Sequence, residues 1–463
     1  MRKNNTNMSS VSVQDWWFAH KNHSDWWFDK LLLLAICTVA WSLIAIRPPT
    51  REAINVFHGG SSLDLKLFVF GGNGVGRIVG NFLAYTLTWN PLGLIQPGQL
   101  ILVGVLGILI WNVLASEPVW VRAGLAGLFI FGFPYLTNGM DRPWACIFGP
   151  TAIMFVAFLY QIARGNQTSA VSYISIACLV VLTALSYETW MMFFVGVSLV
   201  AIGAKLAPGL GGRLQIYNMS NRQVFAIGFP LAGCLLLAVF FPADRGALPT
   251  SGVALSVIPK LTILTARILL NILVDSLPIG AIIGFGVTRS TRPPAFSKMG
   301  LWPYLLVGLI FATVSVNFVY GLVLGGVIDW RSRFLIILML TAFYLSLPWG
   351  SISKWLRART GLYFDNAVRI AMAAAIIKLV YTVVLTFMMH PLNLVGWVDY
   401  RARILAKDAS VFEELTDFGS CDSKYCFTEY RSGGTHALAI EYWADGTAAY
   451  VVPWLRIAAL RID

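Results

Sequence analysis

The chain has 463 residues, of which 57% are hydrophobic and 12% are charged, and its mean hydropathy is +0.70. A soluble domain of this size does not carry so apolar a surface, so the composition places the chain in a lipid bilayer. The net charge of +12 does not indicate a nucleic-acid-binding protein, because most of the basic residues lie in short breaks between apolar stretches.

Apolar stretches of roughly 16 to 25 residues follow one another between residues 31 and 390, and each is long enough to cross the hydrocarbon core as a helix. The short polar breaks and the absence of an alternating apolar pattern exclude a β-barrel. The sequence therefore predicts an all-α polytopic membrane protein with about eleven transmembrane helices.

The distribution of Lys and Arg predicts the orientation in the membrane. The segment 1–30 contains Arg2, Lys3, Lys21 and Lys30 and precedes a first span at Leu31–Ile46, so we expect it to be cytoplasmic. Later breaks are alternately rich and poor in basic residues, so we assign them alternately to the cytoplasmic and the outer side. The predicted transmembrane domain covers residues 31–392. An odd number of spans places the C-terminal tail on the extracytoplasmic side of the membrane. Splitting the poorly apolar segment 261–288 into two spans would place the tail on the cytoplasmic side.

The first outer loop, residues 47–97, is long and begins with polar residues. Its second part, Leu65–Trp89, combines leucines and aromatic residues with Lys66, Arg77 and several glycines. This pattern predicts interfacial helices that lie along the outer leaflet.

The tail, residues 393–463, differs from a membrane helix. Val398–Leu415 has apolar residues at helical spacing, and the segments Ala437–Trp443 and Ala448–Val452 flank a turn at Asp445-Gly446. We expect a small extracytoplasmic α+β domain.

The tail also contains Cys421 and Cys426, which are the only cysteines outside the apolar stretches. An oxidising exterior would allow them to form a disulfide, and two residues are too few for a zinc site. The other four are expected to be buried apolar residues: Cys37, Cys146, Cys178 and Cys234.

Motifs of soluble enzymes and of metal or cofactor sites are mostly absent. The segment Gly71–Gly76 resembles a phosphate-binding loop but lacks the Lys and the Ser or Thr that would follow, and it lies on the outer side. The histidines do not have the spacing of metal ligands. We therefore expect no metal and no cofactor.

Charged residues at the outer face remain as candidates for a site, since an ionisable group near a span costs free energy unless it has a role or a partner. The acids are Glu52, Asp64, Asp141 and Glu188, and the basic candidates are Arg77, Arg142, Arg331, Arg333 and His58. Each acid could instead be a solvated charge or the partner of a neighbouring Arg. Together, carboxylates and guanidinium groups on one face can remove a proton and hold a phosphate.

The order of these features resembles the GT-C class of membrane glycosyltransferases, in particular the bacterial and phage group related to serotype-converting glucosyltransferases. The resemblance is carried by the Gly-Arg element Gly76–Phe82 in the first outer loop and by the outer turn that contains Glu188. It continues in Asp329–Phe334, which opens a late span, and in Asp399–Arg403, which opens the tail. The first loop differs from the family pattern, since only Glu52 closely follows the first span and Asp64 comes alone.

The resemblance implies transfer of a sugar, with inversion, from a polyprenyl-phosphate carrier at the outer face of a bacterial inner membrane. The acceptor would be an envelope glycan or another acceptor, such as a lipid-linked one. Glu52 first and Asp64 second are the expected bases, Asp141 and Glu188 would position the acceptor or orient an Arg, and Arg77 would bind the carrier phosphate. Two alternatives stay open. One is a transporter or flippase, for which Asp275 is the best intramembrane candidate, and the other is an envelope polysaccharide polymerase or ligase.

Overall fold

The computed structural model describes residues 23–45, 77–88, 97–137, 144–163, 169–207, 217–240, 257–289, 300–315, 333–360, 366, 369–380, 425–432 and 435–442. Its helices are α2 (His23–Ala45), α5 (Ile78–Thr88), α6 (Pro97–Val113), α7 (Val119–Thr137), α8 (Trp144–Ala163), α9 (Ala170–Ala184), α10 (Glu188–Leu206), α12 (Asn221–Phe240), α13 (Val257–Arg289), α15 (Trp302–Val314), α17 (Arg333–Ser346) and α18 (Trp349–Thr360). Residues 369–380 are also helical. The strands are β1 (Tyr425–Ser432) and β2 (Thr435–Tyr442).

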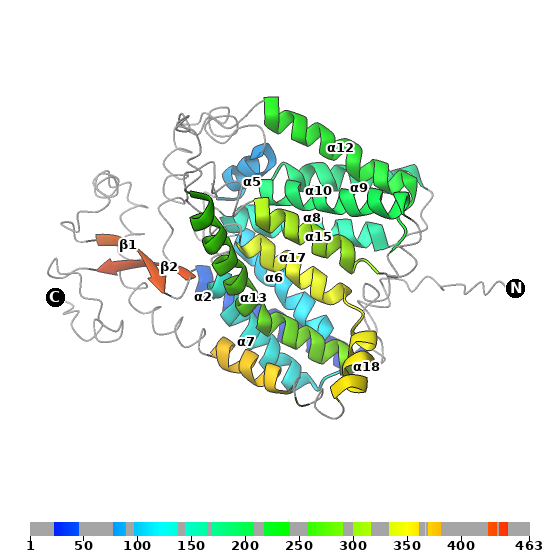
Figure 1. Cartoon of the computed structure of the whole chain (residues 1–463). Coiled ribbons are helices and arrows are strands. Elements are labelled where there is room, and N and C mark those ends of the chain that lie inside the picture. Colours follow the sequence, from blue (N-terminus) through cyan, green and yellow to red (C-terminus); the bar gives the residue numbers. More distant parts are fainter. Residues whose placement is uncertain are drawn as a thin grey trace, which may run out of the picture.

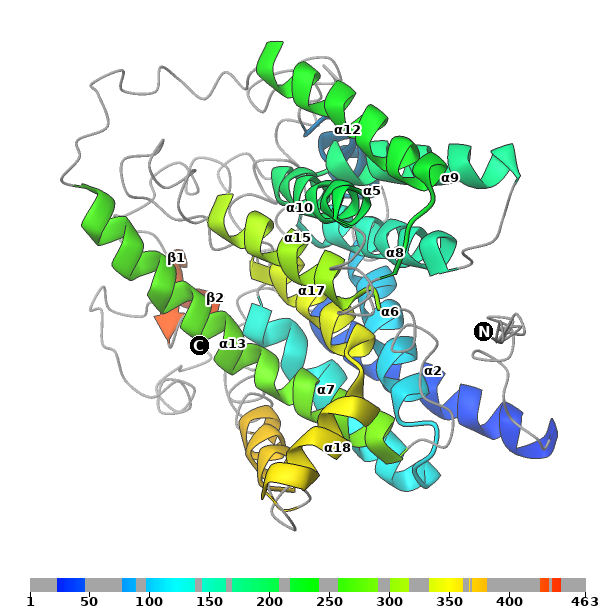
Figure 2. The same ribbon diagram turned by 45° about the vertical axis from the view of Figure 1, so that its right-hand side comes forward.

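The long apolar stretches fold as helices that lie side by side (Figures 1 and 2). Neighbours include α6 with α8, α8 with α9, α9 with α12, and α10 with α15. Prolines inside α8, α12 and α13, at Pro150, Pro230 and Pro278, do not end these helices. Packed helices can tolerate such prolines because neighbouring groups take up the backbone groups that the ring leaves unpaired.

Close packing at the centre of the bundle depends on small residues. A Cβ added to Gly196 in α10 would lie 2.7 Å from the Cα of Gly308 in α15. These two helices are therefore in backbone contact, which is the kind of packing that drives helix association in a bilayer. Beside this contact, α8 and α10 bury a cluster of aromatic rings. The centroid of the Phe155 ring lies 4.6 Å from that of Trp190 and 5.4 Å from that of Phe193.

The two ends of the bundle are distinct. At one end, here named the α5 end, the backbone N–H groups of Val79 and Gly80 donate to Leu185 O in the turn between α9 and α10. At the other, the α18 end, the last turns of α13 contact both the end of α6 and the start of α18. There, an added Cβ at Gly286 would lie 2.5 Å from Val113 O. Figure 1 shows α5 and α18 on opposite sides of the helices.

Within the described residues, three helices are long and apolar enough to cross a membrane, and they are α8, α10 and α12. A fourth span results if α17 and α18 are counted as one bent pair. Shorter apolar helices are Leu100–Val113, Val119–Ile130, Ala170–Ala184, Ser276–Thr288 and Trp302–Val314. The chain therefore has the helical, membrane-associated character that its composition predicts.

Particular boundaries also follow the sequence. Residues 31–45 of the predicted first span are helical as part of α2, and the predicted break before Trp144 falls between α7 and α8. The segment 261–288 belongs to a single helix, α13. One cysteine prediction is wrong: Cys37, Cys146 and Cys234 are buried, but Cys178 is exposed. Cys178 lies on the outward side of α9, where an apolar thiol would face lipid and not the protein core.

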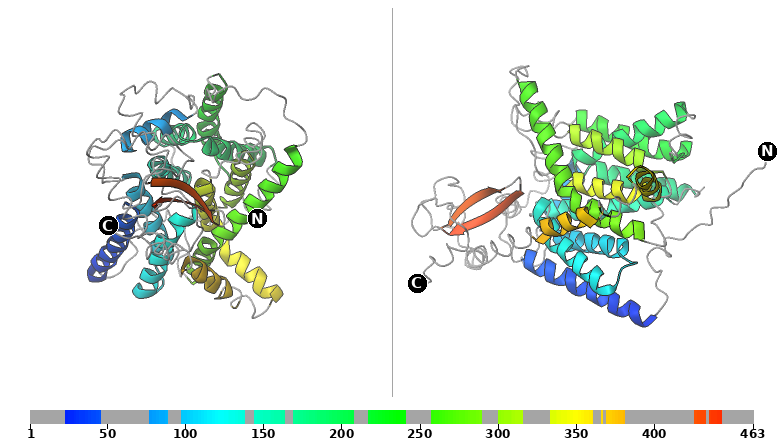
Figure 3. Two further views of the ribbon diagram at one scale, coloured as in Figure 1. Left: turned by 90° about the vertical axis from the view of Figure 1, so that its left-hand side faces the viewer. Right: turned by 60° about the horizontal axis from the view of Figure 1, so that its bottom comes forward.

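The strands form an antiparallel hairpin in which Tyr425 pairs with Tyr442 and Ser432 with Thr435. Figures 1 and 3 show it beyond the helix ends. The predicted strand Ala437–Trp443 is largely β2, and it pairs with β1. The predicted turn at Asp445-Gly446 lies outside the described residues. The predicted partner Ala448–Val452 and the predicted helix Val398–Leu415 lie outside the described residues.

Candidate functional site

Two of the predicted site residues have described side chains, and they lie together at the α5 end. These are Arg77, immediately before α5, and Glu188, the first residue of α10. For Arg333, the first residue of α17, and for Cys426 in β1, the structure describes the backbone alone. The remaining predicted site residues lie outside the described part of the chain: Glu52, His58, Asp64, Asp141, Arg142, Arg331 and Cys421.

The turn between α9 and α10 positions Glu188. α9 ends at Ala184, and Tyr187 has an extended backbone, with φ of −162° and ψ of 137°, which stops one helix and allows the next to begin. The hydroxyl of Ser186 donates to Leu182 O at 2.5 Å and so ties the turn to the last turn of α9. Glu188 is therefore held at the positive end of α10, where a carboxylate is electrostatically favoured.

α5 docks directly onto this turn. Its first backbone N–H groups have no partner inside the helix, and those of Val79 and Gly80 donate to Leu185 O at 3.2 and 3.4 Å. An added Cβ at Gly80 would collide with the carbonyl oxygen of Ser186. A glycine at this position therefore allows the backbone of α5 to approach the turn.

This docking brings Arg77 to Glu188, 111 residues away in the sequence. The Arg77 Nε–H group donates to both carboxylate oxygens of Glu188, at 2.7 Å to Oε1 and 2.6 Å to Oε2. The Arg77 side chain is 9% exposed, whereas that of Glu188 is 39% exposed. The guanidinium group is thus largely enclosed, and its carboxylate partner is partly exposed.

Tyr187 supports the guanidinium group from a second side. The Arg77 Cζ atom lies 4.3 Å from the centroid of the Tyr187 ring, which is a cation–π contact. Tyr187 is itself buried and packs edge-on against Phe148 of α8 at 5.8 Å. Elements α5, α8 and α10 therefore fix the position and the plane of this guanidinium group together.

The charge arrangement is unusual for a helix start. A cation next to the N-terminus of α5 is electrostatically unfavourable, because the helix dipole is positive there. Glu188 and Tyr187 compensate for this cost. The positive end of α5 and the guanidinium group of Arg77 make this place electrostatically attractive for an anion.

Buried polar atoms without a hydrogen-bond partner among the described residues also occur around the turn. They are Thr183 Oγ1, Thr189 Oγ1 and Trp190 Nε1. All three residues are fully buried. Sequence reasoning gave them no role, because Thr and Trp inside an apolar stretch are ordinary span residues; their position next to Glu188 is the signal that could have selected them.

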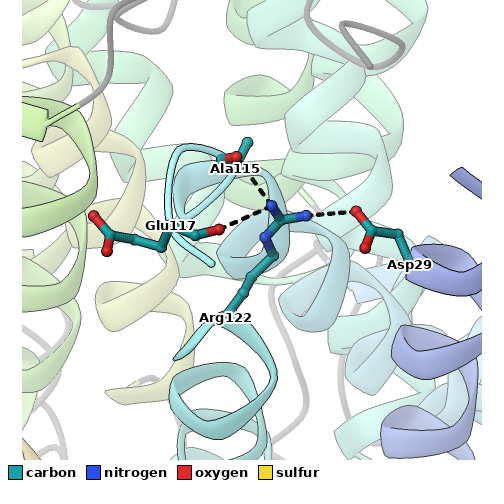
Figure 4. A network of polar contacts seen from close by, with 4 residues as sticks. All are labelled: Asp29, Ala115, Glu117 and Arg122. Carbon is teal, nitrogen blue, oxygen red and sulfur yellow. Dashed lines mark hydrogen bonds and ion pairs between the residues drawn. The ribbon is translucent and has the colours of Figure 1, made fainter. Parts of the chain in front are cut away.

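A second charged network lies at the α18 end (Figure 4). Arg122 in α7 donates from Nη1 to Asp29 of α2 at 2.7 Å and from Nη2 to the carbonyl oxygens of Ala115 and Glu117 at 3.0 and 3.1 Å. Its Cζ atom lies 5.2 Å from the Trp111 ring. Figure 4 shows the Glu117 carboxylate pointing away from Arg122.

This second network fastens α2 to the turn between α6 and α7. The side chains of Arg122 and Asp29 are 5% and 6% exposed, and the Nη1 and Nη2 groups of Arg122 donate to protein oxygens. We therefore assign it to the structure of the bundle and not to a substrate site. Among the described residues, no group of three or more His, Cys, Asp or Glu side chains could hold a metal ion.

Comparisons of the chain with protein-family models, with curated proteins and with solved structures found no match.

Proposed function

We propose that this chain is a multi-pass membrane glycosyltransferase of the GT-C type, with about eleven spans, a cytoplasmic N-terminus and an extracytoplasmic tail. It moves a sugar from a polyprenyl-phosphate carrier to an envelope glycan or lipid-linked acceptor at the outer face. The reaction inverts the configuration at the anomeric carbon.

One observation supports this proposal most. Arg77 and Glu188 come from the two segments, the Gly-Arg element and the outer turn, that carry the resemblance, and they form an ion pair at 2.6 Å at the end of the bundle. Such a pair also forms in proteins with other functions. Here, however, the guanidinium group is enclosed, stacked on Tyr187 and next to a helix N-terminus, as expected for recognition of a phosphate.

The proposed roles follow from the chemistry. The carboxylate of Glu52 or Asp64 takes the proton of the acceptor hydroxyl group while the oxygen of that hydroxyl attacks the anomeric carbon. At the same time the bond between the anomeric carbon and the phosphate oxygen breaks. Arg77 binds the phosphate and stabilises the negative charge that the leaving polyprenyl phosphate acquires. Glu188 is a positioning residue that holds Arg77.

Three substitutions test these roles in purified, folded protein. Arg77→Ala should weaken polyprenyl-phosphate binding and lower turnover, because the contact exists before the transition state. Arg77→Lys keeps the charge but loses the planar fork and most of the stacking on Tyr187, so it should not restore full activity. Glu188→Gln should lower transfer by about tenfold or more through the loss of orientation of Arg77.

Replacing the proposed bases by their amides should lower transfer by about 10² to 10⁴ and leave carrier binding intact. If Glu52→Gln and Asp64→Asn both retain full transfer, the base is another residue and Asp141 is tested next. If Arg77→Ala and Glu188→Gln bind and turn over the carrier as the unsubstituted protein does, the paired residues are structural and the proposed site is wrong.

A further inference from the structure

α18 is bent away from the helix that precedes it and is more polar than the other described helices. It follows α17 after the break at Leu347-Pro348, and the segments Leu335–Ser346 and Trp349–Arg359 meet at 72°. Its sequence contains Lys354, Arg357 and Arg359 and no acidic residue. Figures 1 and 2 show it turned away from α17 at the end of the bundle.

The bend is fixed by specific contacts. Pro348 has no N–H group to continue the hydrogen bonding of α17, so the helix stops there. The Trp349 indole N–H group donates to Tyr344 O in the last turn of α17 at 2.7 Å. A Cβ added to Gly284 in α13 would lie 3.2 Å from the Trp349 ring, so that ring packs tightly onto the backbone of α13.

The two faces of α18 have different surroundings. Trp349, Ile352 and Leu356 recur at helical spacing and are half-buried, and α18 contacts α13. The basic residues Lys354, Arg357 and Arg359 are exposed, and so is Trp355, at 56%. Arg359 Cζ lies 5.1 Å from the Trp355 ring, so a charge and an aromatic ring share the exposed face.

We infer that the exposed face of α18 binds the anionic headgroups of the membrane leaflet at the α18 end. Twelve residues span roughly 18 Å as a helix, too short to cross a bilayer, and the exposed charges exclude the hydrocarbon core. A tryptophan next to basic residues suits the headgroup layer, where indole rings concentrate and anionic lipids attract Lys and Arg. This inference depends on insertion of the helices in a bilayer and is independent of the proposed enzymatic reaction.

The test uses the full chain reconstituted in vesicles of phosphatidylcholine alone or of equal parts phosphatidylcholine and phosphatidylglycerol. A photo-crosslinking amino acid replaces Trp355, and the lipid adducts are identified by mass spectrometry. The variant carries Lys354→Gln, Arg357→Gln and Arg359→Gln. A matched control carries Lys30→Gln, Lys205→Gln and Arg222→Gln, which removes the same charge from other predicted cytoplasmic positions.

We expect adducts with phosphatidylglycerol to predominate in the mixed vesicles. The preference should fall by about tenfold or more in the α18 variant, since each basic residue near an anionic surface contributes roughly a fivefold preference, and it should persist in the control. Adducts that match the bulk lipid ratio, equal losses in variant and control, or crosslinks to protein in place of lipid would each overturn the inference. The substitutions leave the contacts of Trp349 with α13 and α17 unchanged, so the size-exclusion profiles of the variant and the control should match.

Discussion

The buried pair of Asp29 and Arg122 gives the sharpest stability prediction. Both side chains are almost completely enclosed, and they join α2 to the turn between α6 and α7 at 2.7 Å. Removing one partner of a buried ion pair leaves an uncompensated charge, which typically costs about 3 to 5 kcal/mol. Removing both leaves no buried charge and should therefore cost less than the two single changes together.

The two single substitutions should differ in size. Asp29→Asn removes the counter-charge but retains an oxygen that can accept from Arg122, so we expect about 3 kcal/mol of destabilisation. Arg122→Gln leaves Asp29 buried and also removes the donor to the carbonyl oxygens of Ala115 and Glu117. Each carbonyl left unpaired adds roughly 1 to 3 kcal/mol, which makes this the more harmful change.

Thermal unfolding of the purified protein in one detergent measures the effect, with the three variants compared side by side. Of the two single variants, Arg122→Gln should lower the unfolding midpoint more than Asp29→Asn. The double variant should be destabilised by about 2 kcal/mol less than the sum of the two single effects, which is the coupling free energy of the pair. Additive effects, or single variants as stable as the unsubstituted protein, would refute the view that this pair fastens α2.

Two further predictions concern the α5 end and the tail. Gly80→Ala should lower both thermal stability and carrier binding, because the added Cβ would collide with the turn before α10. Gly124→Ala is the matched control: an added Cβ there meets nothing within 4 Å, so this change should be neutral or slightly stabilising in the same measurements. Cys421 and Cys426 should form a disulfide on the extracytoplasmic side, worth roughly 2 kcal/mol at most in such a short loop. Two free thiols in mass analysis under non-reducing conditions would contradict the disulfide. If an impermeant thiol reagent, applied after reduction, labels these cysteines in lysed cells but not in intact cells, the tail is not extracytoplasmic.

The sequence predicts much of the helical architecture, because each long apolar stretch has only one way to satisfy its backbone in lipid. Thus α2 includes residues 31–45 of the predicted first span, and the poorly apolar segment 261–288 lies in one helix, α13. The bend before α18 is less evident, since Pro348 alone does not distinguish a kink from a break. The 72° angle depends on the contacts of Trp349 with Tyr344 and Gly284, which are tertiary.

Only part of the candidate site could be predicted. Arg77 and Glu188 were selected one by one as outer-face charges, but their pairing spans 111 residues and depends on the docking of Gly80 against the turn. Asp29 received no role, because an acid beside Lys30 at the start of a first span resembles a solvated charge. Its burial results from a partner 93 residues away.

The tail shows what local strand signals can and cannot predict. The segment Ala437–Trp443 is predicted as a strand, and most of it forms β2. Its partner β1 is not predicted, because Tyr425–Ser432 mixes polar, charged and aromatic residues without a strict alternation. Only the pairing, from Tyr425 with Tyr442 to Ser432 with Thr435, identifies it as a strand.

Transfer itself is the most direct test of the central claim. The purified protein in vesicles receives a panel of radiolabelled polyprenyl-phosphate hexoses together with an envelope glycan fraction, and the label is followed on the carrier, on the acceptor and across the bilayer. The account predicts that label moves to the acceptor with inverted anomeric configuration and that Arg77→Ala lowers both transfer and carrier binding. Label that crosses the bilayer while still attached to its carrier, unaffected by Arg77→Ala, would contradict the account and favour a transporter.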